Sequence, residues 1–445
     1  MSNNETFNEA IYDAKTLGVP KMLILGLQHV FAMFGATVLV PALTGLSVST
    51  TLLFAGLGTL LFHFLAKGKV PAFLGSSFAF LGGYWAIAPN GEADLLPYAC
   101  FGVVCASLLY IILAALIKAF GIAKVMKFFP PIVTGPIIIA IGLNLSQSAI
   151  DNCAANWWIA LVAILVVIVC NIWGKGMVKI VPILLGVVAS YVVAAVSGQV
   201  DFTAVKEAQW IGLPIVAERT VFAIFKEPDT SSMITAAITI MPIALATIVE
   251  HIGDVSAISS TVGKNYIQDP GLHRTLLGDG LATCLAALFG APANTTYGEN
   301  TGVLTLTKVY DPFIVRIAAV FAVVLSFCPK VSALISCMPV ATLGGVSLVL
   351  YGMISAVGVR NVVENKVDFT KSRNVIIAAL ILVLSIGINY STAGAIAFTI
   401  GGITISLSGL AVGSLVGIIL NAALPGKDYV YNEESLDNPA VNFEV

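Results

Sequence analysis

The chain is a succession of long apolar runs, and this pattern restricts it to one class of fold. A helix needs roughly 20 apolar residues to cross the hydrocarbon layer of a membrane. The strong runs lie at about 22–43, 50–66, 97–117, 129–149, 156–173, 180–197, 234–256, 275–290, 312–328, 332–357, 374–390 and 394–424. They predict an all-α polytopic membrane protein embedded in a lipid bilayer.

Composition excludes the main alternatives. Only 10% of the residues are charged and 58% are hydrophobic, whereas soluble domains carry about 25% charged residues. A soluble enzyme is therefore excluded, and a net charge of −2 provides no basic surface for nucleic acid. The seven cysteines are scattered without a CxxC pair, which is typical of small packed side chains. We expect no bound metal and no cofactor.

Two weaker runs, at 71–89 and 291–307, are rich in Gly, Pro, Ser, Thr and Asn. If both cross the membrane, the chain has 14 transmembrane segments. With a cytoplasmic N-terminus, cytoplasmic segments then contain all but four of the 22 Lys and Arg residues, as the positive-inside rule requires. The four outer ones are Lys206, Arg219, Lys226 and Lys330. Removing either weak span inverts every later loop, so we predict that both cross and that both termini are cytoplasmic.

The two weak runs also resemble each other. Pro71–Ala79 and Pro292–Glu299 both contain paired hydroxyl residues, then an aromatic residue and a small residue. Each run is the third crossing of its half, and an odd number of spans per half makes the repeat inverted. Interrupted spans at matching positions of inverted halves indicate the binding site of a transporter.

Two acids lie deep in the predicted spans. Glu250 belongs to the span Met241–Ser256, and Glu299 belongs to the second broken run. A carboxylate at mid-membrane is costly and usually functional. Asp254 follows Glu250 by one helical turn on the same face, where it is a partner, a proton acceptor or a helix-end acid. We interpret Asp279 as a boundary residue near the cytoplasmic end of its span.

The charges of these spans limit the ligand. No Lys or Arg lies deep in any predicted span, so an inorganic anion lacks its usual partner. The acidic centre suits a cation or a neutral ligand rich in N–H donors, and buried carboxyl groups also exchange protons. His29 and His251 are each typical of a packed, hydrogen-bonded residue. No hydrolase, P-loop or dinucleotide motif occurs, which argues against an intramembrane enzyme.

Several motifs together resemble one transporter family. The Asn-x-Gly-x-x-x-x-Thr pattern formed by Asn300, Gly302 and Thr307 resembles the signature of the nucleobase–cation symporter 2 family, also called the nucleobase–ascorbate family. Further segments are similar to its uracil permease branch, namely Gln28–His29, Phe31–Ala36, Gly75–Phe80, Asp269–Arg274 and Asn294–Asn300. The resemblance extends from about residue 20 to residue 425.

This resemblance implies a fold and a setting. It implies two inverted repeats of seven spans, core and gate domains, and short strands in the broken spans 3 and 10. The implied segments are a cytoplasmic N-terminal segment 1–20, core 21–128, gate 129–198, extracytoplasmic connection 199–233, core 234–329, gate 330–424 and a cytoplasmic tail 425–445. It also implies the cell membrane and a homodimer.

The resemblance further implies a substrate site at mid-membrane and a mechanism. The implied substrate contacts are Glu250, Glu299, Phe78, Gly298, Tyr297, Ala36 and, on the gate side, Tyr351. His29 matches a supporting histidine, and Glu250 and Asp254 are candidates for proton coupling. The implied function is import of uracil by proton symport, with alternating access.

One position keeps a second substrate class open. Some uracil carriers have His where this chain has Asp254, and xanthine and urate carriers often have Asp there. Those purine carriers, however, usually show Gln-Asn where this chain has Glu299-Asn300. A xanthine or urate permease is therefore the alternative within the family, and an uncoupled nucleobase facilitator or channel is the alternative of a different class.

Overall fold

Helices form nearly all of the predicted apolar runs in the computed structural model, which describes residues 10–400 and 403–426. Residues 1–9 of the predicted N-terminal segment and residues 427–445 of the predicted tail lie outside the described residues. Within the described ranges, seven helices are long and apolar enough to cross a membrane. The number is eight if α15 (Pro312–Ser326) and α16 (Pro329–Ser336), which meet at 83°, form one bent span.

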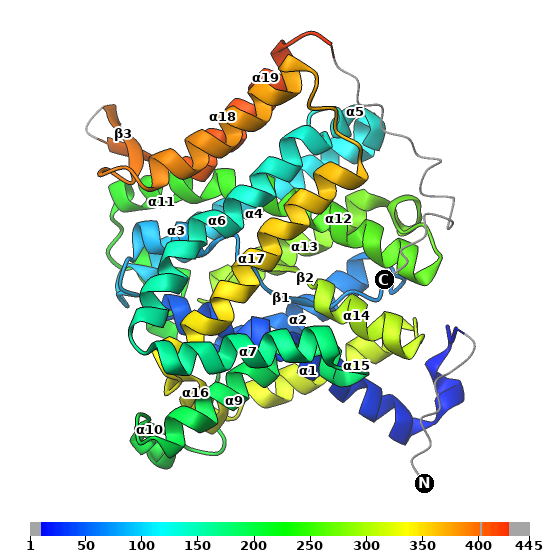
Figure 1. Cartoon of the computed structure of the whole chain (residues 1–445), viewed down its shortest axis with the longest axis vertical. Coiled ribbons are helices and arrows are strands. Elements are labelled where there is room, and N and C mark those ends of the chain that lie inside the picture. The colour runs from blue at the N-terminus through cyan, green and yellow to red at the C-terminus, as the bar shows by residue number, and fades with distance from the viewer. Residues whose placement is uncertain (1–9, 401–402, 427–445) are drawn as a thin grey trace.

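The helices pack in two groups (Figure 1). The first helix group contains α15 together with α1 (Val19–Thr44), α2 (Val48–Leu65), α3 (Leu81–Ile87), α4 (Leu96–Phe120), α11 (Thr230–Ile240), α12 (Ala244–Val262), α13 (Leu272–Leu288) and α14 (Gly298–Thr307). The second helix group contains α6 (Pro131–Ala154), α7 (Trp157–Trp173), α9 (Pro182–Val196), α17 (Val340–Glu364), α18 (Ser372–Asn389) and α19 (Gly409–Ala423). In Figure 1, α6 and α17 run side by side through the second group.

Short helices connect the long ones. They are η1 (Ala14–Leu17), α5 (Ile122–Met126), α8 (Met177–Ile180), α10 (Thr203–Glu207), η2 (Ala217–Arg219), η3 (Val221–Phe225), η4 (Met241–Ile243) and η5 (Ile267–Gly271). Polar side chains cap several long helices, since the first backbone amides of a helix lack internal partners. Ser47 caps α2, Asn156 caps α7 and Asp311 caps α15.

The outer surface of the molecule is apolar. Trp158 exposes 81% of its surface and Val196 exposes 86%. Such large exposed apolar side chains suit contact with lipid acyl chains and not with water. The hydrophobic exterior therefore agrees with a multi-pass membrane protein.

Two short strands cross at the centre of the first helix group. Strand β1 (Leu74–Ser76) pairs antiparallel with β2 (Asn294–Thr296), with Gly75 opposite Thr295. Beyond the strands, Ser77 N donates to Ala293 O at 2.8 Å and Tyr297 N donates to Phe73 O at 3.0 Å. The helices α3 and α14 follow directly. Both weak runs thus contain a strand followed by a short helix, as the family resemblance implied.

A second strand pair corrects the prediction for the last apolar run. Residues 394–424 were expected to form one span, but β3 (Ala395–Ile400) and β4 (Ile403–Ser408) form an antiparallel hairpin there. Only Gly409–Ala423 is helical. The two strands are rich in β-branched residues and the sequence between them is Gly-Gly, a pattern that favours a hairpin over a helix. The fold is therefore mostly helical and not all-α.

The segment at residues 11–17, which we call the N-terminal strap, is bound to the end of α14. Ile11 N donates to Lys308 O at 2.8 Å, and Tyr310 N donates to Ile11 O at 2.8 Å. The hydroxyl of Tyr12 donates to Val262 O at 2.8 Å, at the end of α12. Ala14 N donates to Asp311 Oδ2, also at 2.8 Å. The strap therefore joins the ends of α12 and α14.

Candidate functional site

The site begins where the strand pair ends and α14 starts. Tyr297 precedes α14 and offers no side-chain bond to its first turn, so the first backbone amides have no intrahelical acceptor. These amides and the helix dipole favour negative or electron-rich groups. Glu299 lies in this first turn, as the sequence predicted from the broken run.

Three predicted carboxyl groups meet beside this helix start. Glu250 and Asp254 lie one turn apart on α12, which packs against β2 and α14. Thr296 Oγ1 donates to Asp254 Oδ2 at 2.7 Å and joins α12 to β2. Glu250 is close enough to Asp254, Asp279 and Glu299 to interact electrostatically with each. We call Glu250, Asp254 and Glu299 the carboxyl cluster.

The carboxyl cluster borders open space. A Cβ atom added at Gly253 or Gly298 would meet no atom within 4 Å, and both glycines are exposed. Gly253 precedes Asp254 and Gly298 precedes Glu299 in the chain. The space in front of the carboxyl cluster is therefore able to admit a ligand without moving the backbone.

His29 supports the start of α14 from the side of α1. Asn300 Nδ2 donates to the backbone oxygen of His29 at 3.1 Å and lies 3.0 Å from His29 Nδ1. Because an amide nitrogen only donates, Nδ1 is the acceptor nitrogen of this ring. Both side chains are buried. The contact therefore joins α1 to the first turn of α14, beside Glu299.

Tyr297 and Ala36 lie in the packed wall beside the strands. Tyr297 OH donates to Ser76 O at 2.9 Å, and Thr37 Oγ1 is 3.4 Å from the same hydroxyl. The Tyr297 ring lies directly on Gly75, where any side chain would clash. Ala36 is buried next to Thr37. Both residues are thus buried, and Tyr297 packs against β1.

Phe78 and Tyr351 connect the two helix groups. Their ring centroids are 6.3 Å apart and the ring planes are inclined by 68°. Phe78 lies between β1 and α3, whereas Tyr351 lies in the middle of α17. The buried Tyr351 hydroxyl lies beside the side chains of Ser148 in α6 and Ser347 in α17. The aromatic contact therefore packs Phe78 of the first helix group against the ring of a tyrosine whose hydroxyl is held within the second group.

Two residues of the sequence motif stand apart from the carboxyl cluster. Thr307 Oγ1 donates to Val303 O at 2.8 Å and closes the last turn of α14. Gly302 faces α8, where an added Cβ would lie 4.0 Å from Ile180 Cγ2. The structure therefore places Gly302 and Thr307 in positions that shape α14, while Asn300 contacts the site through His29.

A buried pair behind the site was missed by the sequence reasoning. His251 Nδ1 lies 3.1 Å from Asp279 Oδ2, and both side chains are fully buried. The interpretation of Asp279 as a boundary residue is therefore wrong, because α13 starts at Leu272 and places Asp279 about two turns inside. Gly278 and Gly280 allow α13 to pack closely on α2 and α4. Small residues on both sides of an acid were the available signal of burial.

No group of three or more His, Cys, Asp or Glu side chains suitable for a metal occurs within residues 10–400 and 403–426. The seven cysteines are unpaired and buried or half-buried. The described residues thus place the carboxyl cluster among apolar helices, beside the two strand–helix segments β1–α3 and β2–α14.

The sequence matches the permease family over residues 20–394. The chain belongs to this family, the nucleobase–cation symporter 2 family that its motifs indicated. It is 40% identical to the uracil permease of Bacillus caldolyticus over 443 residues, which covers 97% of this chain and 98% of that protein. It is 39% identical to the uracil permease of Bacillus subtilis, with 90% of this chain and 91% of that protein covered.

A solved structure shares the fold at low sequence identity. The transmembrane domain of the cyanobacterial bicarbonate transporter BicA matches with a TM-score of 0.58 at 16% identity. The match covers 93% of this chain and 99% of that domain. The arrangement of helices is therefore one that other membrane transporters use.

Proposed function

We propose that this protein imports uracil by proton symport. The observation that carries the proposal is the carboxyl cluster, in which Glu250 and Glu299 border open space beside the free amides of a half-helix. The names of the uracil permease relatives support the same substrate. Glu299 favours uracil over xanthine or urate, because the purine carriers of the family usually have Gln at that position.

The chemistry of uracil complements this site. Uracil has two N–H donors and two carbonyl acceptors, so Glu250 and Glu299 accept the N–H groups. The backbone amides of Phe78 and Gly298 donate to the carbonyl oxygens, and Tyr297, Ala36 and Tyr351 contact the ring. Every polar atom of the ligand then has a partner in a site where an unpaired one costs about 1–3 kcal/mol.

The proposed transport cycle uses the two helix groups as separate bodies. We propose 14 crossings in two inverted repeats, with the core domain at 21–128 and 234–329 and the gate domain at 129–198 and 330–424. The preferential packing of helices within each group supports this division. In Figure 1, β3 and α10 lie at the left and α5 at the right. Since α5 contains Lys124, this separation supports a cytoplasmic side at the right.

Repulsion among neighbouring carboxylates is the proposed basis for coupling proton binding to uracil transport. Glu250, Asp254 and Glu299 are mutually repulsive when all are ionised, and Asp279 adds a fourth negative charge nearby. Each bound proton removes part of this repulsion. Glu250 is the first candidate for the coupled proton because it lies deepest in a continuous apolar run, and Asp254, one helical turn away, is the second.

Two measurements test the proposal. Purified protein is titrated with uracil, xanthine, urate and cytosine, and we expect uracil to bind most tightly. Uptake of labelled uracil into energised cells should be strong at mildly acidic outside pH and collapse with a protonophore. Tighter binding of xanthine overturns the substrate, and uptake that ignores the protonophore but requires sodium overturns the coupling. Uptake without accumulation identifies an uncoupled facilitator.

A further inference from the structure

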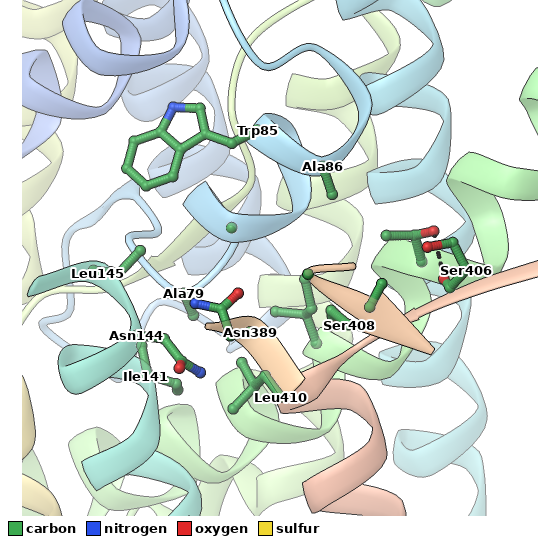
Figure 2. A pocket seen from close by; sticks show the side chains of 15 residues that line it. Ala79, Trp85, Ala86, Ile141, Asn144, Leu145, Asn389, Ser406, Ser408 and Leu410 are labelled. Carbon is green, nitrogen blue, oxygen red and sulfur yellow. Dashed lines mark hydrogen bonds between the residues drawn. The ribbon is translucent and has the colours of Figure 1, made fainter. Parts of the chain in front are cut away.

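A cavity with several polar residues in its lining lies away from the carboxyl cluster. It has a volume of about 270 Å³ and lies between α3, α6, α11 and the β3–β4 hairpin (Figure 2). Its polar lining residues are Asn144, Thr239, Asn389, Ser406 and Ser408. No member of the carboxyl cluster lines it. The volume is close to the lower end of small-molecule sites, which begins near about 300 Å³.

Two carboxamide groups face this cavity from different helices. Figure 2 shows the side chains of Asn144 and Asn389 directed into the same space. The Oδ1 atom of Asn144 is buried and has no hydrogen-bond partner within the described residues. Buried acceptors are normally satisfied by protein, water or ligand. This oxygen is therefore available to a donor that enters the cavity.

The surrounding structure holds the two carboxamides together. Tyr390 OH lies 3.2 Å from Leu143 O and 3.0 Å from Asn144 O, and this contact fixes the end of α18 against the middle of α6. Thr239 Oγ1 donates to Ser406 O at 2.9 Å and fixes the hairpin to α11. The cavity thus has walls from both helix groups. Hydrogen bonds fix α18 to α6 on one side and the hairpin to α11 on the other.

The wall formed by α3 is lined by small side chains. Ala79 and Gly82 leave room there, since a Cβ at Gly82 would meet no atom within 4 Å. Trp85 also borders the cavity, but its Nε1 donates to Leu43 O of α1 at 3.2 Å, and Figure 2 shows its indole directed away from the two carboxamides. The small residues of α3 therefore leave space for a planar ring beside the carboxamides.

The cavity adjoins the aromatic contact that connects the helix groups. Ala79 directly follows Phe78, and the lining residue Ile141 precedes Gly142, which packs on the backbone of Tyr351. Phe78 and Tyr351 contact each other as described above. The Phe78–Tyr351 contact therefore lies next to the cavity wall. In the proposed function, the same two residues contact the substrate.

We propose that this cavity is an outer docking site, in which a nucleobase binds before it reaches the carboxyl cluster. The inference rests on the proposed function. A carboxamide presents one donor group and one acceptor, so it pairs with the adjacent N–H and C=O of a nucleobase edge. The two asparagines provide this recognition without charge, and the small residues Ala79 and Gly82 leave room for the ring. Neutral hydrogen bonds are weaker than those to carboxylates, so the docking site releases its ligand more readily than the carboxyl cluster.

The test separates uptake from equilibrium binding. Asn144→Leu and Asn389→Leu remove the carboxamides at nearly constant volume. We expect each to raise the KM for uracil uptake about two- to tenfold, the effect of one lost neutral hydrogen bond. The Kd of purified protein for uracil, which reports the carboxyl cluster, should change less than twofold. Gln147→Leu is the control, because Gln147 lies one turn further along α6, is exposed and bonds to Asp151.

Several results would overturn the docking site or the function on which it rests. Unchanged KM in both variants overturns the docking site, and so does a loss of Kd that equals the change in KM. A phospholipid that co-purifies with the wild type and is lost from Asn144→Leu also overturns it, because the cavity is then a lipid site. If the wild type neither binds nor transports any nucleobase, the proposed function itself fails, which is a different result from unchanged KM in an active transporter.

Discussion

The imidazole Nδ1 of His251 lies 3.1 Å from Oδ2 of Asp279, and neither side chain has any exposed surface. His251 follows Glu250 in α12, so this contact joins the helix of the carboxyl cluster to α13. Removing one partner of a buried pair leaves the other without compensation, at a cost of about 3–5 kcal/mol.

The first prediction concerns this pair. We expect Asp279→Ala and His251→Ala each to lower the melting temperature of the purified protein clearly. The double variant should lose less than the sum of the two, with a coupling of about 0.5–3 kcal/mol. The control is Asp94→Ala in an exposed loop, which should melt like the wild type. Fully additive effects would show that the two side chains act separately.

The second prediction concerns Glu250 and Glu299. Changing either to Ala removes a charge-assisted hydrogen bond worth about 1.5–3 kcal/mol, so uracil affinity should fall roughly tenfold to hundredfold. Glu364→Ala, at the exposed end of α17, should bind normally. Glu299→Gln should weaken uracil binding and shift the ratio of uracil to xanthine affinity toward xanthine. An unchanged ratio would remove Glu299 as the determinant of substrate choice.

The third prediction separates the two proton candidates. Asp254→Asn keeps the shape of the side chain that accepts from Thr296 but cannot ionise. If Glu250 carries the proton, this variant should still accumulate uracil, and its uptake should still fall as outside pH rises. Loss of accumulation with intact binding and intact downhill exchange would instead assign the proton to Asp254. Labelled-uracil uptake and counterflow in vesicles distinguish the two results.

The fourth prediction uses the open space beside the carboxyl cluster. Gly298→Ala adds a methyl group that meets no protein atom within 4 Å, so folding should be unaffected or slightly favoured. The same methyl group occupies space that we assign to the ligand, so uracil affinity should drop by at least about tenfold. Gly387→Ala in α18 also has no atom within 4 Å and is the control for helix propensity. Normal binding by Gly298→Ala would move the ligand elsewhere.

The fifth prediction concerns orientation. Cysteines introduced at the exposed positions Ala93 and Ala204 should react in intact cells with a membrane-impermeant thiol reagent. A cysteine at Glu364 should react only after the cells are opened. The wild type provides the background, since its seven cysteines are buried or half-buried. Labelling of Glu364→Cys from outside would reverse the orientation drawn from the positive charges.

The positions of the long helices were predictable from the sequence, because each apolar run is recognised from its own residues. The interruption of 71–89 and 291–307 was readable from their Gly, Pro, Ser and Thr content, whereas the strands in them were implied only by the family resemblance. The hairpin at Ala395–Ser408 was not foreseen, since its β-branched residues are as apolar as those of a span. Hydropathy measures transfer into lipid and does not distinguish a strand from a helix over a short run.

The site was predictable in its charges and not in its packing. Glu250 and Glu299 were conspicuous because few acids lie within apolar runs. The contact of Thr296 with Asp254 and the pairing of His251 with Asp279 depend on how α12, α13 and β2 pack. Such contacts join residues from separate elements, and no local pattern encodes the angle between two helices.

The N-terminal strap has a consequence for the order in which the protein is completed. Ala14 and its acceptor Asp311 are 297 positions apart, and ribosomes add about 5–20 residues per second. The strap therefore waits about 15 to 60 seconds during synthesis for the segment that it binds. Throughout that interval, the start of α1 is in place while the end of α14 does not yet exist. Closure of the strap is thus a late event, and a nascent chain that stops before Asp311 leaves its own first residues unbound.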